Sequence, residues 1–326
     1  MHRDRRLCRG DGLALAGLRR YGRRIAAPAD QVYALIRDAV DWPQHFIPTL
    51  HVERAALGPD SERLWIWATA NGDVTHWTSH RTLDPRRRRI VFEQEVCSPP
   101  VAAMSGEWTV DDGPDGGCEL VLHHTFSAVD DLPENVDWIT SATDRNSRTE
   151  LANIRALAEN AQADAELLFS FADSETVRGP SEQVYAFLQE AGAWPDRLPH
   201  VSRLDLREPS EGLQLMTMVT RAGNGSEHTT ESVRVCFPHD RIVYKQLTTP
   251  PLMATHIGQW LLQETDDGVC VTSHHTIRVN EAAIPAVLGP EATPATARDY
   301  LREAVGGNSA ATLSLAKRFA EAPHAV

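Results

Sequence analysis

A short segment, Trp77-Thr78-Ser79-His80-Arg81, brings together side chains that could act on one ligand. Side chains alternate between the two faces of a β-strand, so Trp77, Ser79 and Arg81 would share one face. We expect a face that carries tryptophan to line a cavity, where an unpaired guanidinium is costly. Arg81 and Ser79 could therefore donate hydrogen bonds to a carbonyl or anionic oxygen of a ligand. A second interpretation stays open, in which Arg81 pairs with a carboxylate on the sheet.

Two adjacent histidines, His123 and His124, occur in a later strand-like segment and recur as His274-His275. Imidazole titrates near neutral pH, so His124 is a candidate general base or acid, with a structural role as the alternative. Neighbours on a strand point to opposite faces, and periodicity does not tell which histidine of the pair faces inward. No HExxH or carboxylate cluster accompanies them, and no GxGxxG motif follows a strand. We therefore expect neither a metal site nor a dinucleotide cofactor.

The sequence around these residues is repeated. RRIAAPADQVYALIRDAVDWP, which starts at Arg23, matches ETVRGPSEQVYAFLQEAGAWP, which starts at Glu175, and further matches follow in the same order as far as the histidine pairs. A repeat this long indicates duplicated domains, because solenoid repeats have only about 20 to 50 residues. We expect an N-terminal extension over residues 1–19, a first domain over 20–162 and a second domain over 163–326.

Each copy predicts the same order of elements. A short strand precedes a helix, in which Val32, Leu35 and Ile36 recur at helical spacing before the Trp-Pro pair breaks it. Alternating segments separated by turn signals then predict consecutive antiparallel strands. A final helix places Leu151 and Ile154 on one face. A curved sheet around such a helix encloses a cavity, so the fold class is α+β, with the domain present in tandem.

The composition narrows the class of partner. There are 32 Lys+Arg against 45 Asp+Glu, a net charge of −13, which argues against a general nucleic-acid binder. No run approaches the roughly 20 apolar residues of a membrane span, and the Arg-rich start is too short in apolar residues for a signal peptide. We expect a cytoplasmic protein. Its five cysteines are odd in number and have no CxxC pair, so ordinary thiols are expected.

The segment DWPQHFIPTLHVE, the tryptophan-rich strand pair that ends in WTSHR, and the final long helix resemble the polyketide aromatase/cyclases. The duplication resembles their didomain branch, and the resemblance covers about residues 20–322. It implies a helix-grip fold, similar to lipid-transfer and plant-allergen domains, with a pocket between the sheet and the C-terminal helix.

The family resemblance also implies an activity. Family members act without a metal or redox cofactor on a poly-β-ketone attached to an acyl carrier protein. The didomain branch follows a minimal polyketide synthase and a ketoreductase, closes the first ring between carbons seven and twelve, and dehydrates it. Two other interpretations stay open: a non-catalytic helix-grip module that carries or templates a hydrophobic ligand, and an interaction scaffold.

Residue roles follow from the same resemblance. The family's functional arginine and serine fall at Arg81 and Ser79, which would anchor and polarise the polyketone. Single-domain members carry a pocket tyrosine where this sequence has Thr49, so His124 is the candidate to replace that tyrosine. The residues expected to line the pocket are Trp42, Phe46, Thr49, Trp65, Trp67, Trp77, Met104 and Trp108. Of these, Trp42, Met104 and Trp108 align with pocket residues of the family.

The second copy keeps the polar residues and loses aromatic ones. Ser232 and Arg234 correspond to Ser79 and Arg81, while Thr230 replaces a tryptophan. Its expected pocket residues are Arg234, Ser232, Trp194 and Trp260. We therefore predict that the first domain holds the principal site and that the second supports it, closes it or binds the chain secondarily.

Overall fold

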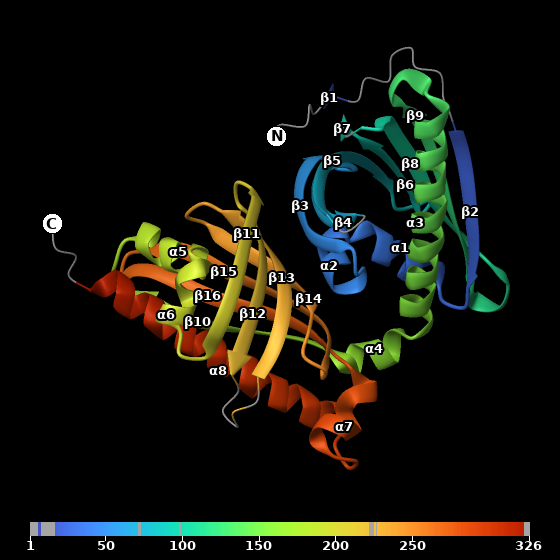
Figure 1. Ribbon diagram of the computed structural model, residues 1–326. Helices are drawn as coiled ribbons and strands as arrows, with labels where there is room; N and C mark the ends of the chain where they lie inside the picture. The colour runs from blue at the N-terminus through green and yellow to red at the C-terminus, as the bar shows by residue number, and fades with distance from the viewer. Residues whose placement is uncertain are drawn as a thin grey trace. The chain divides into compact units, whose positions relative to one another are not determined.

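The computed structural model describes residues 6–7, 17–70, 73–97, 99–221, 225 and 227–322. It divides into two compact units, residues 1–161 and 162–326 (Figure 1). Each unit has a seven-stranded antiparallel sheet and one long helix. The predicted tandem α+β architecture is confirmed.

In the first unit, the sheet has the order β2-β9-β8-β6-β5-β4-β3, and β1 pairs with β7 separately. The elements are β1 (Arg6–Leu7), β2 (Gly17–Ile25), α1 (Ala29–Arg37), α2 (Trp42–His45), β3 (Thr49–Gly58), β4 (Ser61–Ala70), β5 (Asp73–Asp84), β6 (Arg89–Gln94), β7 (Val96–Cys97), β8 (Val101–Asp112), β9 (Cys118–Ala128) and α3 (Pro133–Glu159).

The second unit repeats this plan in the order β10-β16-β15-β14-β13-β12-β11. Its elements, after the connecting helix α4 (Ala161–Leu167), are β10 (Leu168–Val177), α5 (Ser181–Gln189), α6 (Trp194–Arg197), β11 (Val201–Ser210), β12 (Leu213–Arg221), β13 (Glu227–Phe237), β14 (Arg241–Thr248), β15 (Met253–Thr265), β16 (Gly268–Val279), α7 (Ile284–Leu288) and α8 (Pro294–Glu321).

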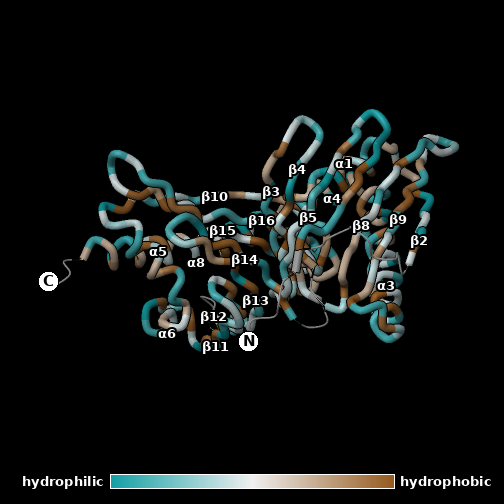
Figure 2. The backbone as a smooth tube through the Cα atoms, turned by 90° about the horizontal axis from the view of Figure 1, so that it is seen from above, coloured by the Kyte–Doolittle hydropathy of each residue, from teal (hydrophilic) through white to brown (hydrophobic). Residues whose placement is uncertain are grey.

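The long helices cover one face of each sheet (Figure 1). Helix α3 packs against β2 and β9 and buries Ser147, Leu151 and Ile154, whose spacing puts them on one side of the helix. Helix α8 packs in the same way against β10 and β16. Figure 2 shows hydrophobic and hydrophilic stretches alternating along the chain, as expected for strands with one buried face.

The Trp-Pro pair begins a helix instead of breaking one. Helix α1 already ends at Arg37, and α2 starts at Trp42 with Pro43 in its first turn. Proline suits that position because the first N–H groups of a helix have no partner within the helix. The second unit repeats this arrangement in α6.

The expectation of five ordinary thiols is wrong for Cys97, which is disulfide-bonded. Cys118, Cys236 and Cys270 are free, and Cys8 lies outside the described residues. Within the described ranges, no helix combines the length and the apolar character needed to cross a membrane.

Candidate functional site

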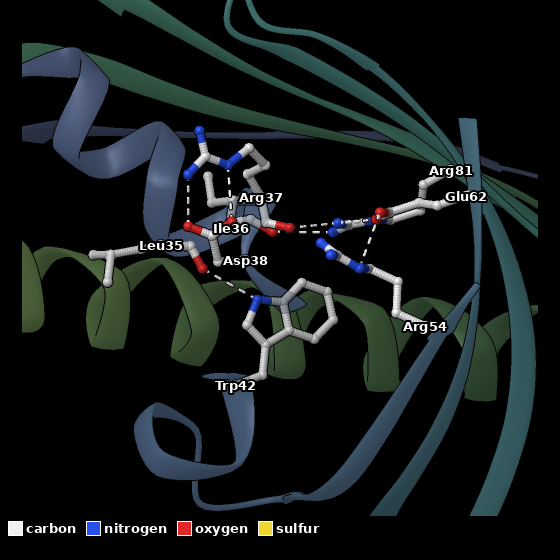
Figure 3. A network of polar contacts seen from close by, with 8 residues as sticks. All are labelled: Leu35, Ile36, Arg37, Asp38, Trp42, Arg54, Glu62 and Arg81. Carbon is white, nitrogen blue, oxygen red and sulfur yellow. Dashed lines mark hydrogen bonds and ion pairs between the residues drawn. The ribbon is translucent and has the colours of Figure 1, made fainter. Parts of the chain in front are cut away.

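Arg81 lies inside the first unit, with 2 % of its surface exposed. Its Nε donates to Glu62 Oε1 at 2.8 Å, and its Nη2 donates to the same carboxylate. Nη1 and Nη2 also donate to the carbonyl oxygens of Ile36 at 3.0 Å and Arg37 at 2.6 Å (Figure 3). The guanidinium also lies 5.4 Å from the centre of the Trp42 ring.

These contacts use most of the hydrogen-bonding capacity of Arg81. A guanidinium has five N–H groups, and four bonds to protein acceptors are made here. The two carbonyls are the negative end of α1, which a cation stabilises. The structure therefore favours the interpretation in which Arg81 pairs with a carboxylate, although the pair is buried. We infer that Arg81 fixes β5, β4 and the end of α1 in place.

The other predicted residues of this strand also face inward. Ser79 is buried and its hydroxyl donates to the Glu93 carbonyl at 3.2 Å. Trp77 packs with Trp42 against a buried cluster that contains Leu64.

Four further predicted wall residues are at least partly buried. Phe46 and Trp108 belong to the main core of this unit, Met104 packs against Phe126, and Thr49 is buried at the start of β3. The indole of Trp42 is also fixed, because its N–H donates to the Leu35 carbonyl at 3.1 Å (Figure 3).

Trp65 and Trp67 do not line the interior, so their predicted role as pocket walls is wrong. On β4 the buried residues include Leu64 and Ile66, and alternation puts the two tryptophans on the opposite face. Trp65 lies beside Arg63, at 6.0 Å from the guanidinium. Trp67 contacts the rings of two outward-facing histidines, His51 and His76.

His124 is the inward member of the histidine pair. It shares a face of β9 with the buried residues Leu122 and Phe126. The centre of its ring lies 5.5 Å from the centre of the Phe92 ring, edge to face. Gly106 makes room for Phe92, because a Cβ atom there would lie 2.3 Å from that ring. Nδ1 of His124 is buried without a hydrogen-bond partner among the described residues. Desolvation lowers the pKa of His124 to about 4, so the imidazole is neutral at pH 7.

Glu150 is a candidate site residue that the sequence analysis missed. It lies on α3, one helical turn from Ser147 and from Ile154, and so on the inward side of the helix. Desolvation raises the pKa of Glu150 from 4.5 to about 7. The Oγ of Ser147 beside it is buried with no hydrogen-bond partner in the described part of the chain. One sequence signal marks this part of the helix: the pair Asn146-Ser147 is repeated as Asn308-Ser309, which aligns helix α3 with helix α8.

Glu150 has the properties expected of a general acid, and His124 has those expected of a general base. Their environments move the two pKa values in opposite directions, so a protonated carboxyl and a neutral imidazole coexist near neutral pH. Pairs with divergent pKa values mark acid–base assignments in many active sites. The interior of the first unit can therefore donate one proton and accept another.

The raised pKa of Glu150 predicts a pH-dependent stability difference. The folded pKa of about 7 exceeds the ordinary 4.5, so the stabilising effect of the carboxyl is complete below pH 4.5 and is lost as pH rises through 7. We expect the free energy of unfolding of Glu150→Gln to exceed that of wild type by on the order of 2 kcal/mol at pH 8 and to be about equal to it at pH 4.5. Urea unfolding at both pH values measures this, and an equal difference at both would contradict it.

The second unit contains a partly open cavity of about 340 Å³. Each predicted second-domain residue lines it: Arg234, Ser232, Trp194 and Trp260. Arg234 is 1 % exposed and donates to the Leu188 and Gln189 carbonyls at the end of α5, as Arg81 does at the end of α1. Its Nη1 donates to Gln214 Oε1 at 2.7 Å.

His275, the counterpart of His124 in the second unit, has hydrogen-bond partners at both ring nitrogens, whereas Nδ1 of His124 has none among the described residues. His275 Nε2 lies 2.8 Å from both Ser273 Oγ and Ser309 Oγ, and His275 Nδ1 lies 3.0 Å from His256 Nε2. Desolvation lowers the pKa of His275 to about 4 and that of His256 to about 3. Thr312 occupies the position that corresponds to Glu150 in the first unit. In this cavity the His275 imidazole is therefore hydrogen-bonded at both nitrogens, and the carboxyl group of Glu150 has no equivalent.

Across the residues that the structure describes, no group of three or more His, Cys, Asp or Glu side chains could hold a metal ion.

Comparison with known proteins identifies relatives that match this chain over most of its length and most of theirs. Residues 20–159 match the family model described as polyketide cyclase / dehydrase and lipid transport. The granaticin polyketide synthase bifunctional cyclase/dehydratase of Streptomyces violaceoruber is 43 % identical over 91 % of this chain and 92 % of that protein. The actinorhodin polyketide synthase bifunctional cyclase/dehydratase of Streptomyces coelicolor is 44 % identical over 89 % of this chain and 92 % of that protein.

Solved structures match more than nine tenths of the chain. The di-domain ARO/CYC BexL from the BE-7585A biosynthetic pathway superposes with a TM-score of 0.88 at 47 % identity, over 94 % of this chain and all of that one. The di-domain ARO/CYC StfQ from the steffimycin pathway gives 0.85 at 32 % identity, over 93 % of this chain and 98 % of that one. The chain therefore belongs to the di-domain polyketide cyclase/dehydratase family.

Proposed function

We propose that this protein closes and dehydrates the first ring, between carbons seven and twelve, of a ketoreduced poly-β-ketone carried by an acyl carrier protein. The observation that carries the proposal is the placement of two titratable groups on the inward faces of the first unit, His124 on β9, with a buried Nδ1 that has no partner among the described residues, and Glu150 on α3. The relatives named as bifunctional polyketide synthase cyclase/dehydratases support the reaction class. In this proposal the protein works in the cytoplasm beside a type II minimal synthase and a ketoreductase.

Both chemical steps need the same two groups. In ring closure, neutral His124 accepts a proton from a carbon between two carbonyls, and the enolate carbon attacks a third carbonyl to form the carbon–carbon bond. That carbonyl oxygen takes a proton from Glu150 and becomes a hydroxyl. In dehydration, the Glu150 carboxylate removes the neighbouring C–H proton, the C–O bond breaks, and the hydroxyl leaves as water with the proton that His124 took up in ring closure. Such proton transfers contribute about 10² to 10⁴ in rate each.

The first unit is the better candidate for this chemistry. His124 has a buried nitrogen without a partner among the described residues, whereas both nitrogens of His275 are engaged. Glu150 has no carboxyl counterpart in the second unit, where Thr312 stands. Aromatic side chains such as Trp42 and Trp108 would favour a curled chain by excluding extended conformations. We propose that residues 20–162 form the catalytic domain and that residues 163–326 form an accessory domain.

A reconstituted pathway tests the proposal. A minimal synthase would be run with and without the ketoreductase, and each reaction with and without this protein, using labelled acetate units to locate the first ring. We expect this protein to convert shunt products into one aromatic compound closed between carbons seven and twelve, and to do so when the ketoreductase is present. An unchanged product mixture would contradict the proposal.

A further inference from the structure

The cavity of the second unit differs from the first-unit site in its charge. Its described lining contains no aspartate or glutamate. Four histidines line it, His200, His228, His256 and His275. Burial lowers the pKa of His200, His256 and His275, so that His256 and His275 are neutral at pH 7. It contains two arginines, Arg221 and Arg234. Arg221 is exposed and pairs with Glu227 at 3.3 Å, whereas Arg234 is buried.

Among the residues that the structure describes, Arg234 has no carboxylate partner, and a single exchange between the two copies accounts for this. Glu62 pairs with Arg81 across β4 and β5, and Gln214 takes the same register position opposite Arg234 across β12 and β13. The first guanidinium is bonded directly to a buried carboxylate, while the second is bonded to a neutral amide. A buried cation without a neutralising partner attracts an anion strongly, because little water screens it.

The Glu208 carboxylate, which acts on Arg234 electrostatically, does not replace Glu62. Glu208 accepts from Gln214 Nε2 at 3.4 Å and so lies beyond the amide, not against the guanidinium. It is exposed, and water screens the charge of an exposed carboxylate. Arg234 also has further donors, since its bonds to described residues number three and a guanidinium has five N–H groups.

We propose that the second unit is a binding site for a planar aromatic ligand with an ionised oxygen, an enolate, phenolate or carboxylate, held at Arg234. Trp194, Trp260, Met216 and Tyr244 line the cavity and supply flat or adaptable apolar contacts. The anionic oxygen pairs with the guanidinium, and Ser232 on the same strand face supplies a hydroxyl.

This inference rests on the proposed function for the identity of the natural ligand, the enolised product of ring closure. Its test measures binding alone, so the two can fail separately. If the probe binds but the protein does not change the pathway products, the anion-binding site is supported and the proposed cyclase function is contradicted. If the protein makes the aromatic product but the probe does not bind, the cyclase function is supported and the anion-binding site is contradicted.

Titration calorimetry on the full chain at pH 7 would compare 2-naphthoate with its neutral analogue 2-naphthamide. We expect wild type to bind the anion about tenfold more tightly than the amide, the range for hydrogen bonds to a charged group. Gln214→Glu should weaken naphthoate binding about tenfold and change naphthamide binding less than twofold. This variant should fold, because Glu62 occupies the equivalent place in the first unit.

Arg221→Gln is the matched control, since it removes the other cavity arginine, and it should change naphthoate binding less than twofold. Equal affinities of the two probes for wild type would overturn the proposal without any variant. Unchanged naphthoate binding in Gln214→Glu, or a loss in Arg221→Gln alone, would also overturn it.

Discussion

Replacing His124 with glutamine is expected to lower kcat by about 10² to 10⁴, the usual contribution of a positioned base, with a much smaller change in KM. The physical reason is that the imidazole is neutral in the folded protein and has a buried nitrogen with no described partner. Glutamine keeps the approximate volume and polarity but cannot accept a proton at this pH. Steady-state rates on a carrier-bound or thioester substrate analogue measure the loss.

His123→Gln is the control for this prediction. His123 is the neighbouring residue on β9 and faces away from Leu122 and Phe126, so its loss should leave kcat within about twofold. Equal effects of the two substitutions, or full activity of His124→Gln, would contradict the assignment of the base.

Arg81→Ala is expected to destabilise the first unit by about 3 to 5 kcal/mol, the cost of breaking a buried ion pair. Glu62 would stay buried without its cation, and the carbonyls of Ile36 and Arg37 would lose their donors. For a unit of this size, such a loss lowers the melting temperature by about 10 °C. Calorimetric melting of the full chain measures it.

The double variant Arg81→Met with Glu62→Leu separates packing from chemistry. Removing both charges leaves no unpaired ion, so we expect most of the lost stability to return. If Arg81 acts by positioning, activity should return with stability. A stable but inactive double variant would instead show that the guanidinium acts on the substrate.

Much of the fold followed from the sequence because duplication doubles every signal. A pattern such as the Val32, Leu35 and Ile36 spacing is ambiguous alone, but its recurrence in the second copy fixed the order of elements. The inward direction of Ser79 and Arg81 also followed from strand alternation. The same alternation puts Trp65 and Trp67 on the outer face of β4, because residue type alone does not determine which face of a strand a tryptophan occupies.

The site residues were harder to predict because their function depends on tertiary contacts. A carboxylate partner for Arg81 lies 19 positions away, and only strand register brings Glu62 opposite it. Glu150 reads as an ordinary polar residue of a helix until burial raises its pKa. His124 and His275 are equivalent in sequence, and the difference between them comes from Ser273, His256 and the other neighbours.

The most direct test of the catalytic assignment is the product profile of the reconstituted pathway with Glu150→Gln, beside Arg148→Gln as an exposed control on the same helix. Because Glu150 titrates near pH 7, wild-type activity should fall as pH rises above that value, and Glu150→Gln should lose this dependence. We predict that Glu150→Gln accumulates undehydrated or shunt products while Arg148→Gln makes the normal aromatic compound. A normal product at the normal rate and pH profile from Glu150→Gln would contradict the account.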